Sequence, residues 1–195
     1  MLGAIKYNLA NLANPAGRDA RQTFWYYMLF LVITQVVVST IAAMPMYIAM
    51  FGGAIDAAQS GANEQEMNAL MFANMRGHLH TQMWVGAVMG LIMAALFSAA
   101  FVRRLHDSGK PGWLLLLVLL PYLASLAFSI VNFDAIMAMT ERMMTMTDPA
   151  EVMASQSKLY AYSLPSWIAY IVTIVFGVMR SNDGPNRYGD APVRF

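Results

Sequence analysis

Four long apolar stretches alternate with polar segments along this chain of 195 residues. They cover about residues 24–50, 82–102, 113–133 and 163–179. Crossing the hydrocarbon core of a bilayer takes roughly 20 apolar residues in a helix, because lipid offers backbone N–H and C=O groups no other partners. The pattern therefore predicts an all-α, polytopic membrane protein with four transmembrane helices, forming a single membrane domain over residues 1–195.

Three prolines modify this prediction only locally. Pro45 lies in the first stretch, Pro121 in the third, and Pro165 near the start of the fourth. Proline removes one backbone donor, but neighbouring helices can satisfy the freed carbonyl inside a membrane. We therefore expect kinks at Pro45 and Pro121, at positions packed against other helices.

The two longer loops, about 51–81 and 134–162, carry helical signals of their own. In the first loop, apolar side chains recur at helical spacing at Met67, Leu70, Met71 and Met75. In the second, Asp148, Pro149 and Glu151 form a typical helix start. Each loop is expected to contain a short amphipathic helix lying on the membrane surface.

The charged residues predict an orientation. Nine of the twelve Lys and Arg residues, against four acidic ones, lie in the two terminal segments and the turn after the second apolar stretch. The two longer loops share three basic and seven acidic residues. Because basic flanking residues stay on the cytoplasmic side, this bias predicts a multi-pass protein with both termini in the cytoplasm.

Composition agrees with a membrane location and excludes several kinds of functional site. Hydrophobic residues make up 58% of the chain and charged residues only 12%, about half the soluble average. There is no cysteine, which excludes disulfides, thiol nucleophiles and thiolate metal sites. The first apolar stretch is also too long for a signal peptide, so we expect it to be retained.

Small side chains line one face of the second apolar stretch. They recur every four residues at Gly86, Gly90, Ala94 and Ser98. Helices in lipid associate through close backbone approach at such faces. This face is expected to be buried, either within the helix bundle or between two copies in a homo-oligomer.

A metal site is a weaker alternative. Met75, His78, His80 and Met83 offer thioether and imidazole groups, which suit Cu(I) or silver. Methionine is also a flexible apolar residue that fills helices, and the chain contains 18 of them without a tight repeat. We therefore expect no metal and no other cofactor.

Three polar motifs are brought to one membrane face by the predicted topology. They are Gly17-Arg18-Asp19-Ala20-Arg21 with the following Phe24-Trp25, Arg103 to Trp113, and Asn186-Arg187-Tyr188-Gly189. The middle motif predicts a tight helical hairpin, because Gly109 suits a left-handed helix end and Pro111-Gly112 lets the chain re-enter the membrane.

On these motifs the sequence resembles a family of bacterial inner-membrane proteins catalogued as domain of unknown function 805. The resemblance rests on Gly-Arg-x-x-Arg-x-x-Phe-Trp at 17–25, Arg-Arg-Leu-His-Asp-x-Gly-x-x-Gly-Trp at 103–113 and Asn-Arg-Tyr-Gly at 186–189. It departs from shorter members at Leu114, where a second tryptophan is usual, and by a long insertion after Pro121. The resemblance implies a small inner-membrane protein without an established activity.

Two interpretations of the polar motifs remain open. In the first, the arginines only anchor the spans, while His106 and Asp107 form hydrogen bonds across the loop, with Arg187 as one candidate partner of Asp107. In the second, clustered guanidinium groups and loop amides bind lipid phosphate or an acidic segment of a partner protein. The candidate residues are Arg18, Arg21, Arg103, Arg104, His106, Asp107, Lys110, Asn186 and Arg187.

These motifs favour a non-catalytic module of the bacterial inner membrane that binds anionic lipid headgroups or a partner protein at its cytoplasmic face. One alternative is a subunit of a small-solute or ion transporter or channel, although the predicted spans contain no Asp, Glu, Lys, Arg or His. The other is a membrane enzyme using His106, Asp107 and Ser108, for which no catalytic signature is present. No nucleic-acid-binding motif is present.

Overall fold

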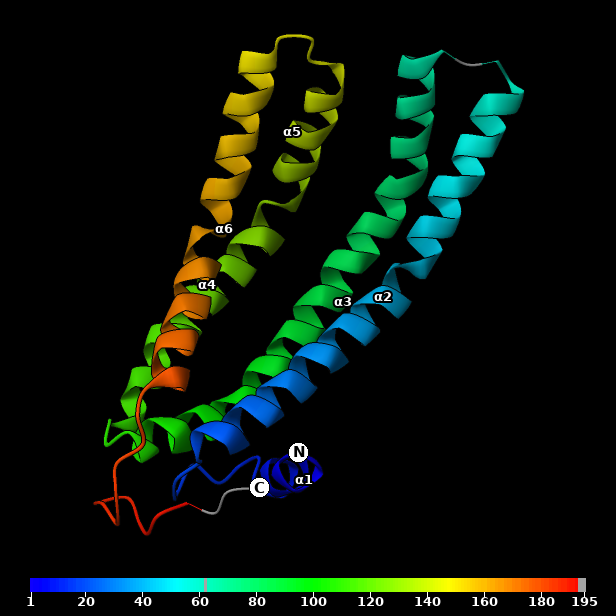
Figure 1. Ribbon diagram of the computed structural model, residues 1–195. Coiled ribbons are helices and arrows are strands. Elements are labelled where there is room, and N and C mark those ends of the chain that lie inside the picture. The colour runs from blue at the N-terminus through cyan, green and yellow to red at the C-terminus, as the bar shows by residue number, and fades with distance from the viewer. Residues whose placement is uncertain (62, 193–195) are drawn as a thin grey trace. The chain divides into compact units, whose positions relative to one another are not determined.

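The computed structural model describes residues 1–61 and 63–192, which form helices and connecting segments without a strand (Figure 1). Helix α1 spans Leu2–Ala10, α2 spans Arg21–Gln59 and α3 spans Glu64–Asp107. A 3-10 turn, η1 (Gly112–Leu115), leads into α4 (Leu116–Val131), α5 (Phe133–Thr145) and α6 (Pro149–Val178). Four segments, α2, α3, η1 with α4, and α6, are long and apolar enough to cross a membrane. The predicted all-α fold with four spans is confirmed.

Both predicted amphipathic segments of the longer loops are helical, but each is continuous with a membrane span. Helix α3 contains residues 67–75 as well as the second apolar stretch, and α6 contains residues 149–160 as well as the fourth. Nothing between 64 and 107 ends the helix, since that range lacks proline and an isolated Gly77 costs only about 1 kcal/mol. At 44 residues α3 is about 66 Å long, roughly twice the thickness of a hydrocarbon core.

The three prolines within spans do not end their helices. Pro45 lies inside α2, Pro121 inside α4 and Pro165 inside α6. Pro45 is exposed on the single chain and Pro121 is half-buried. Helices in lipid can continue through proline, but the expectation that Pro45 lies at a packed position is wrong for the single chain, since Pro45 is exposed.

The chain divides into two compact units, each built from non-contiguous segments. The first unit contains residues 1–36, 89–126 and the segment from Leu164 onward. Its core packs an aromatic ring of α2 against rings of α3, with the Phe24 centroid 6.4 Å from that of Phe97 and 6.1 Å from that of Phe101. The Tyr27 hydroxyl donates a hydrogen bond to the Leu96 carbonyl at 3.2 Å, which ties the same two helices together.

The second unit contains residues 37–88 and 127–163. Here the later part of α2 packs against the beginning of α3, close enough that a Cβ atom on Gly53 would lie 2.5 Å from the Asn74 side chain. The Phe128 and Tyr162 rings, on α4 and α6, lie 4.8 Å apart between centroids. Small residues therefore permit close helix contact in this unit, as lipid-facing helices require.

Candidate functional site: a buried arginine–aspartate cluster

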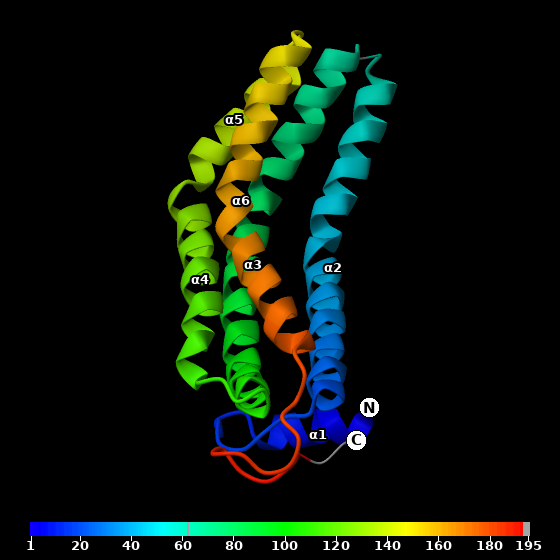
Figure 2. The same ribbon diagram turned by 60° about the vertical axis from the view of Figure 1, so that its left-hand side comes forward.

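The polar motifs meet at one end of the first unit, which we call the polar end. It comprises residues 1–20, the turn at 102–112 and the tail at 179–192. Helix α1 lies there crosswise to the start of α2, as two views show (Figures 1 and 2). Gly109 has a φ of +70°, so the turn after α3 uses the left-handed conformation expected of it.

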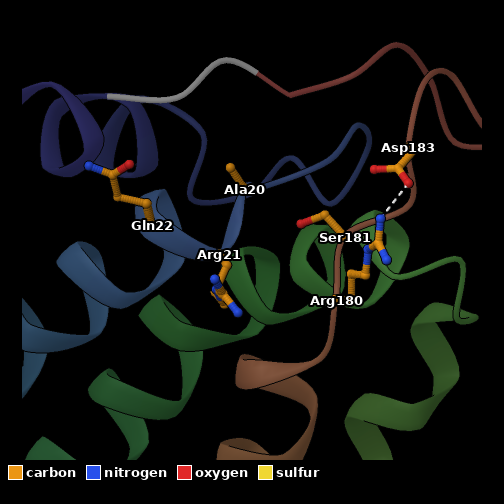
Figure 3. Close-up of a pocket in the computed structure, with 6 residues that line it drawn as sticks. All are labelled: Ala20, Arg21, Gln22, Arg180, Ser181 and Asp183. Carbon is orange, nitrogen blue, oxygen red and sulfur yellow. Dashed lines mark hydrogen bonds and ion pairs between the residues drawn. The ribbon is translucent and has the colours of Figure 1, made fainter.

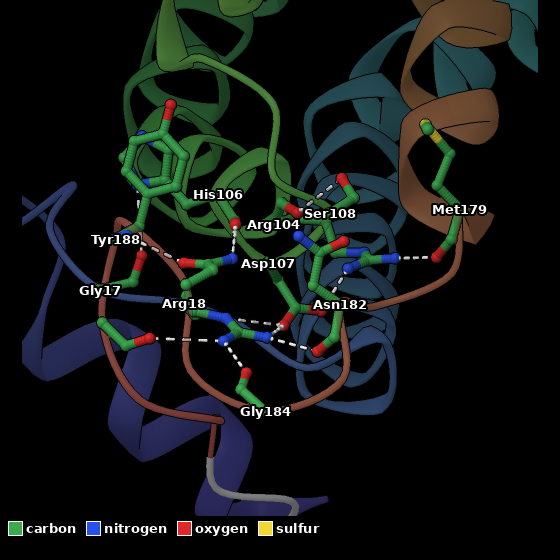
Figure 4. A network of polar contacts seen from close by, with 12 residues as sticks. Gly17, Arg18, Arg104, His106, Asp107, Ser108, Met179, Asn182, Gly184 and Tyr188 are labelled. Atoms are coloured by element: carbon green, nitrogen blue, oxygen red, sulfur yellow. Dashed lines mark hydrogen bonds and ion pairs between the residues drawn. The ribbon is translucent and has the colours of Figure 1, made fainter.

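Asp107, at the end of α3, is the central acceptor of the polar end (Figure 4). Its Oδ1 atom accepts hydrogen bonds from Nε and Nη2 of Arg18 at 3.2 and 3.0 Å. Its Oδ2 atom accepts from Nη1 of Arg104 at 2.6 Å. All three side chains are at most 1% exposed. A buried carboxylate is here shared between two guanidinium groups.

Other donors of these two arginines bind backbone carbonyls at the end of α6 and in the C-terminal tail. Arg18 donates to Gly184 at 2.7 Å and to Asn182 at 2.8 Å. Arg104 donates to Gly177 at 3.1 Å and also to the Met179 carbonyl. Such complete pairing matters, because a buried charge without partners costs several kcal/mol. Carbonyls of the tail thus accept hydrogen bonds from both buried guanidinium groups.

Arg103 makes a second group of contacts, all with the N-terminal segment. Its Nε atom donates to Asp19 Oδ1 at 3.1 Å, and its Nη2 atom donates to Asn8 Oδ1 at 2.6 Å. Nη1 donates to the carbonyls of Asn11 and Asn14, and the guanidinium lies 5.5 Å from the Tyr7 ring centroid. Arg103 therefore connects α3 to α1 and to the segment that follows α1. We call Arg18, Asp19, Arg103, Arg104 and Asp107 the buried arginine–aspartate cluster.

Asp19 is the least satisfied member of this cluster. The residue is 1% exposed, and its Oδ2 atom is buried without a hydrogen-bond partner among the described residues. Burial raises the pKa of this carboxyl to about 6, although the Arg103 guanidinium opposes the shift. Burial, with the nearby Asp19 charge, also raises the pKa of Tyr7. Near neutral pH a fraction of Asp19 carries its proton.

His106 and the C-terminal motif form a separate layer beside the cluster. The His106 Nδ1 atom lies 3.2 Å from the Gly17 carbonyl and donates to it, since a carbonyl only accepts. The His106 ring stacks on Tyr188 with centroids 3.8 Å apart. Asn186 donates from its side chain to the His106 carbonyl at 2.9 Å, and Arg187 contacts the Gly109 carbonyl at 3.4 Å.

A comparison with protein-family models places the sequence of this chain in a known group. Residues 12–190 match the family described as Protein of unknown function (DUF805). The chain belongs to this family. Neither the search of curated proteins nor the search of solved structures gave a match. In this DUF805 member, helix α1 lies before the residues that match the family model. Its Asn8 nevertheless accepts a hydrogen bond from Arg103, which lies within the match.

The structure brings most of the predicted polar residues together, but in two classes. Arg18, Arg103 and Arg104 are buried and paired, whereas Arg21 and Arg187 are exposed and Lys110 is partly exposed. The five arginines therefore do not form one open anion site in this DUF805 chain. The partners of Asp107 are Arg18 and Arg104 rather than Arg187 across the loop, because Arg187 contacts Gly109 and Tyr188 instead.

His106, Asp107 and Ser108 are adjacent in sequence but have different partners. His106 binds Gly17, Asp107 binds two arginines, and the Ser108 hydroxyl donates to the Leu105 carbonyl at 3.1 Å. A hydroxyl bound to its own helix in this way is not paired with the neighbouring imidazole. Successive helical side chains diverge by about 100°, which explains the separation.

The residues of the small face and of the metal alternative are placed as follows. Gly90 is buried, and a Cβ atom there would lie 2.5 Å from the Tyr122 hydroxyl, while Gly86 has nothing within 4 Å of such an atom. Ala94 and Ser98 are half-buried, and the Ser98 hydroxyl donates to the Ala94 carbonyl at 2.6 Å. The His80 ring lies 5.5 Å from Phe133 and 6.5 Å from Trp84 between centroids; His78, Met75 and Met83 are half-buried.

Proposed function

We propose that the protein is a non-catalytic module of the bacterial inner membrane whose polar end faces the cytoplasm and binds anionic lipid headgroups. One observation supports this most directly: basic residues at the polar end or directly beside it fall into a buried, paired set and an exposed set. The exposed or partly exposed set is Lys6, Arg21, Lys110, Arg180 and Arg187. Among the described residues, Arg180 alone of these forms an ion pair, with Asp183.

The buried set cannot serve as the lipid-binding surface, so the exposed set carries the proposal. The guanidinium groups of Arg18, Arg103 and Arg104 are occupied by aspartates and carbonyls. Exposed Lys and Arg side chains next to a membrane contribute about 1 kcal/mol each toward anionic lipid. Five such residues at or directly beside the polar end supply a combined attraction of about 5 kcal/mol at low salt.

The charge distribution supports the cytoplasmic orientation of the polar end. Of the twelve basic residues, eight that the structure describes lie in segments of the polar end or directly beside it. Retention of such residues on the cytoplasmic side is the general rule for inner-membrane proteins, and that leaflet also carries the negative surface potential. The same basic residues thus support both the cytoplasmic orientation of the polar end and its proposed binding of anionic lipid.

Lipid binding can be measured on the full chain in nanodiscs containing equal amounts of phosphatidylglycerol and phosphatidylcholine. Native mass spectrometry of lipids that remain bound should show enrichment of phosphatidylglycerol. Replacing Lys6, Lys110 and Arg187 by glutamine should reduce this enrichment. Lys158→Gln is the matched control, because Lys158 is exposed on α6 in the second unit. Equal retention of both lipids by the wild-type protein would contradict the proposal.

A further inference from the structure

A pocket of about 240 Å³ opens at the beginning of α2 (Figure 3). It is lined by Ala20, Arg21, Gln22, Arg180, Ser181 and Asp183. This volume is many times the roughly 10–15 Å³ that a single water needs in a cavity, which leaves room for a hydrated phosphate group. All of its lining residues belong to the first unit.

Arg21 contributes to the pocket a guanidinium group whose donors are available to a ligand. Its side chain is exposed and has no hydrogen bond or ion pair with any described residue. A guanidinium group has five N–H donors in a planar fork that fits two oxygens of a phosphate. The three buried arginines of the same end have no such capacity, since their donors are used within the protein.

The second cation of the pocket, Arg180, is bound only weakly. Its ion pair with Asp183 has a nitrogen–oxygen distance of 2.8 Å, but the two side chains are 84% and 87% exposed. Exposed pairs of this kind contribute about 0–1 kcal/mol, so an incoming anion can displace Asp183 or share Arg180 with it. Ser181 adds a hydroxyl to the same lining, and Gln22 adds an amide.

The backbone at the start of α2 adds positive potential to the pocket. Arg21 is the first residue of α2, a helix of 39 residues, and no acidic residue lies in its first turn. The N-terminal end of a helix carries a partial positive charge of about half a unit. In this pocket that charge adds to two guanidinium groups and is opposed only by Asp183.

The pocket lies where two spans of the first unit meet the aqueous boundary. The apolar part of α2 begins at Phe24, and α6 ends at Val178, two residues before Arg180. Near this level the Trp25 indole donates to the Gly177 carbonyl at 3.1 Å, which joins α2 to α6. Lipid phosphates lie at this depth of a bilayer, beside interfacial tryptophans.

We infer that this pocket binds the phosphate group of an anionic ligand through Arg21 and Arg180. The inference rests on the proposed function and names its principal subsite. A lipid headgroup and a free phosphate compound share the chemistry, and the location at the boundary of α2 and α6 favours the headgroup. The Ser181 hydroxyl donates a further hydrogen bond to the phosphate oxygens.

The test is calorimetric titration of the full chain in neutral detergent with dihexanoyl phosphatidylglycerol, glycerol 3-phosphate and inorganic phosphate. Arg21→Gln combined with Arg180→Gln should weaken binding of the lipid probe about tenfold or more, as expected from the loss of charged hydrogen bonds. Asp183→Asn should tighten binding by about twofold to fivefold, because a competing carboxylate is removed. Lys158→Gln should change nothing.

The probes distinguish the two sources of phosphate. Tighter binding of the lipid probe than of the two free compounds assigns the pocket to headgroups, and equal binding of all three assigns it to free phosphate compounds. An affinity within twofold of wild type in the double variant overturns the inference. If the nanodisc enrichment of phosphatidylglycerol also survives in that variant, the lipid-binding function stands and this pocket is not its site.

Discussion

Arg18 and Asp107 lie 89 positions apart in the sequence and form a buried ion pair with a nitrogen–oxygen distance of 3.0 Å. The pair joins the segment before the first span to the end of the second. Arg104 binds the other oxygen of the same carboxylate. One acidic residue therefore compensates two arginines that would otherwise be uncompensated away from water.

Asp107→Asn should be among the most destabilising single substitutions in the chain. Removing the carboxylate leaves Arg18 and Arg104 buried without their counter-charge, and breaking such a pair costs about 3–5 kcal/mol. The measurement is the thermal unfolding midpoint of the purified protein in detergent. Asp183→Asn, which breaks an exposed pair, is the control and should shift the midpoint little. Similar shifts of the unfolding midpoint in both variants would show that burial does not determine how much the Asp107 ion pairs contribute to stability.

Stability should depend on pH through Asp19. Its pKa rises to about 6 in the folded protein from an ordinary value near 3.8, so the fold favours the protonated form. That stabilisation is complete below the ordinary pKa and is lost as the pH rises through about 6, an effect of roughly 3 kcal/mol at most. The unfolding midpoint of wild type, relative to Asp19→Asn, should therefore fall between pH 4 and pH 7. A difference that stays constant or rises over this interval would refute the assignment.

Helix α1 should come loose when its contact with Arg103 is removed. Asn8→Ala deletes the acceptor at 2.6 Å and leaves a buried guanidinium donor unsatisfied, at a cost of about 1–3 kcal/mol. Hydrogen exchange of residues 2–10 should accelerate, while the core around Phe24 and Phe101 keeps its protection. Ala10→Ser changes an exposed position of the same helix and serves as the control. Unchanged exchange in Asn8→Ala would mean that other contacts hold α1.

Gly177 should not tolerate a side chain. A Cβ atom there would lie 2.7 Å from Trp25 Cζ2 and 3.0 Å from Phe24 Cε1, and the Gly177 carbonyl also accepts from Arg104. Gly177→Ala is expected to lower the free energy of unfolding by about 1–3 kcal/mol through overpacking. Gly86→Ala has open space around the new atom and should be neutral or stabilising by up to about 1 kcal/mol. Denaturant titration of both variants checks the contrast.

The spans and the meeting of the polar motifs were predictable because both follow from local pattern. Twenty consecutive apolar residues leave few structures open to a chain in lipid, so the α4 and α6 spans could be located despite Pro121 and Pro165. The left-handed Gly109 was predictable for the same reason, since a tight turn between two helices needs a residue that tolerates positive φ.

The choice of partners inside the polar end was not predictable from spacing. Arg18, Arg21 and Arg187 look equivalent in the sequence, yet only the first is buried, because its donors meet the Asp107 carboxylate and tail carbonyls far away along the chain. Helix α1 was also missed. Leu2, Ile5 and Leu9 recur at helical spacing, but a helix of nine residues depends on tertiary contacts such as Asn8 with Arg103.

The carbonyls that complete Arg18 come very late during synthesis of the chain. Those of Asn182 and Gly184 follow Arg18 by 164 and 166 positions, so the ribosome delivers them after all four spans have been made. Until then the N-terminal arginine has an incomplete set of acceptors. Closure of the cluster is thus a final assembly step, and a nascent chain interrupted before the tail leaves the Arg18 guanidinium group partly unsatisfied.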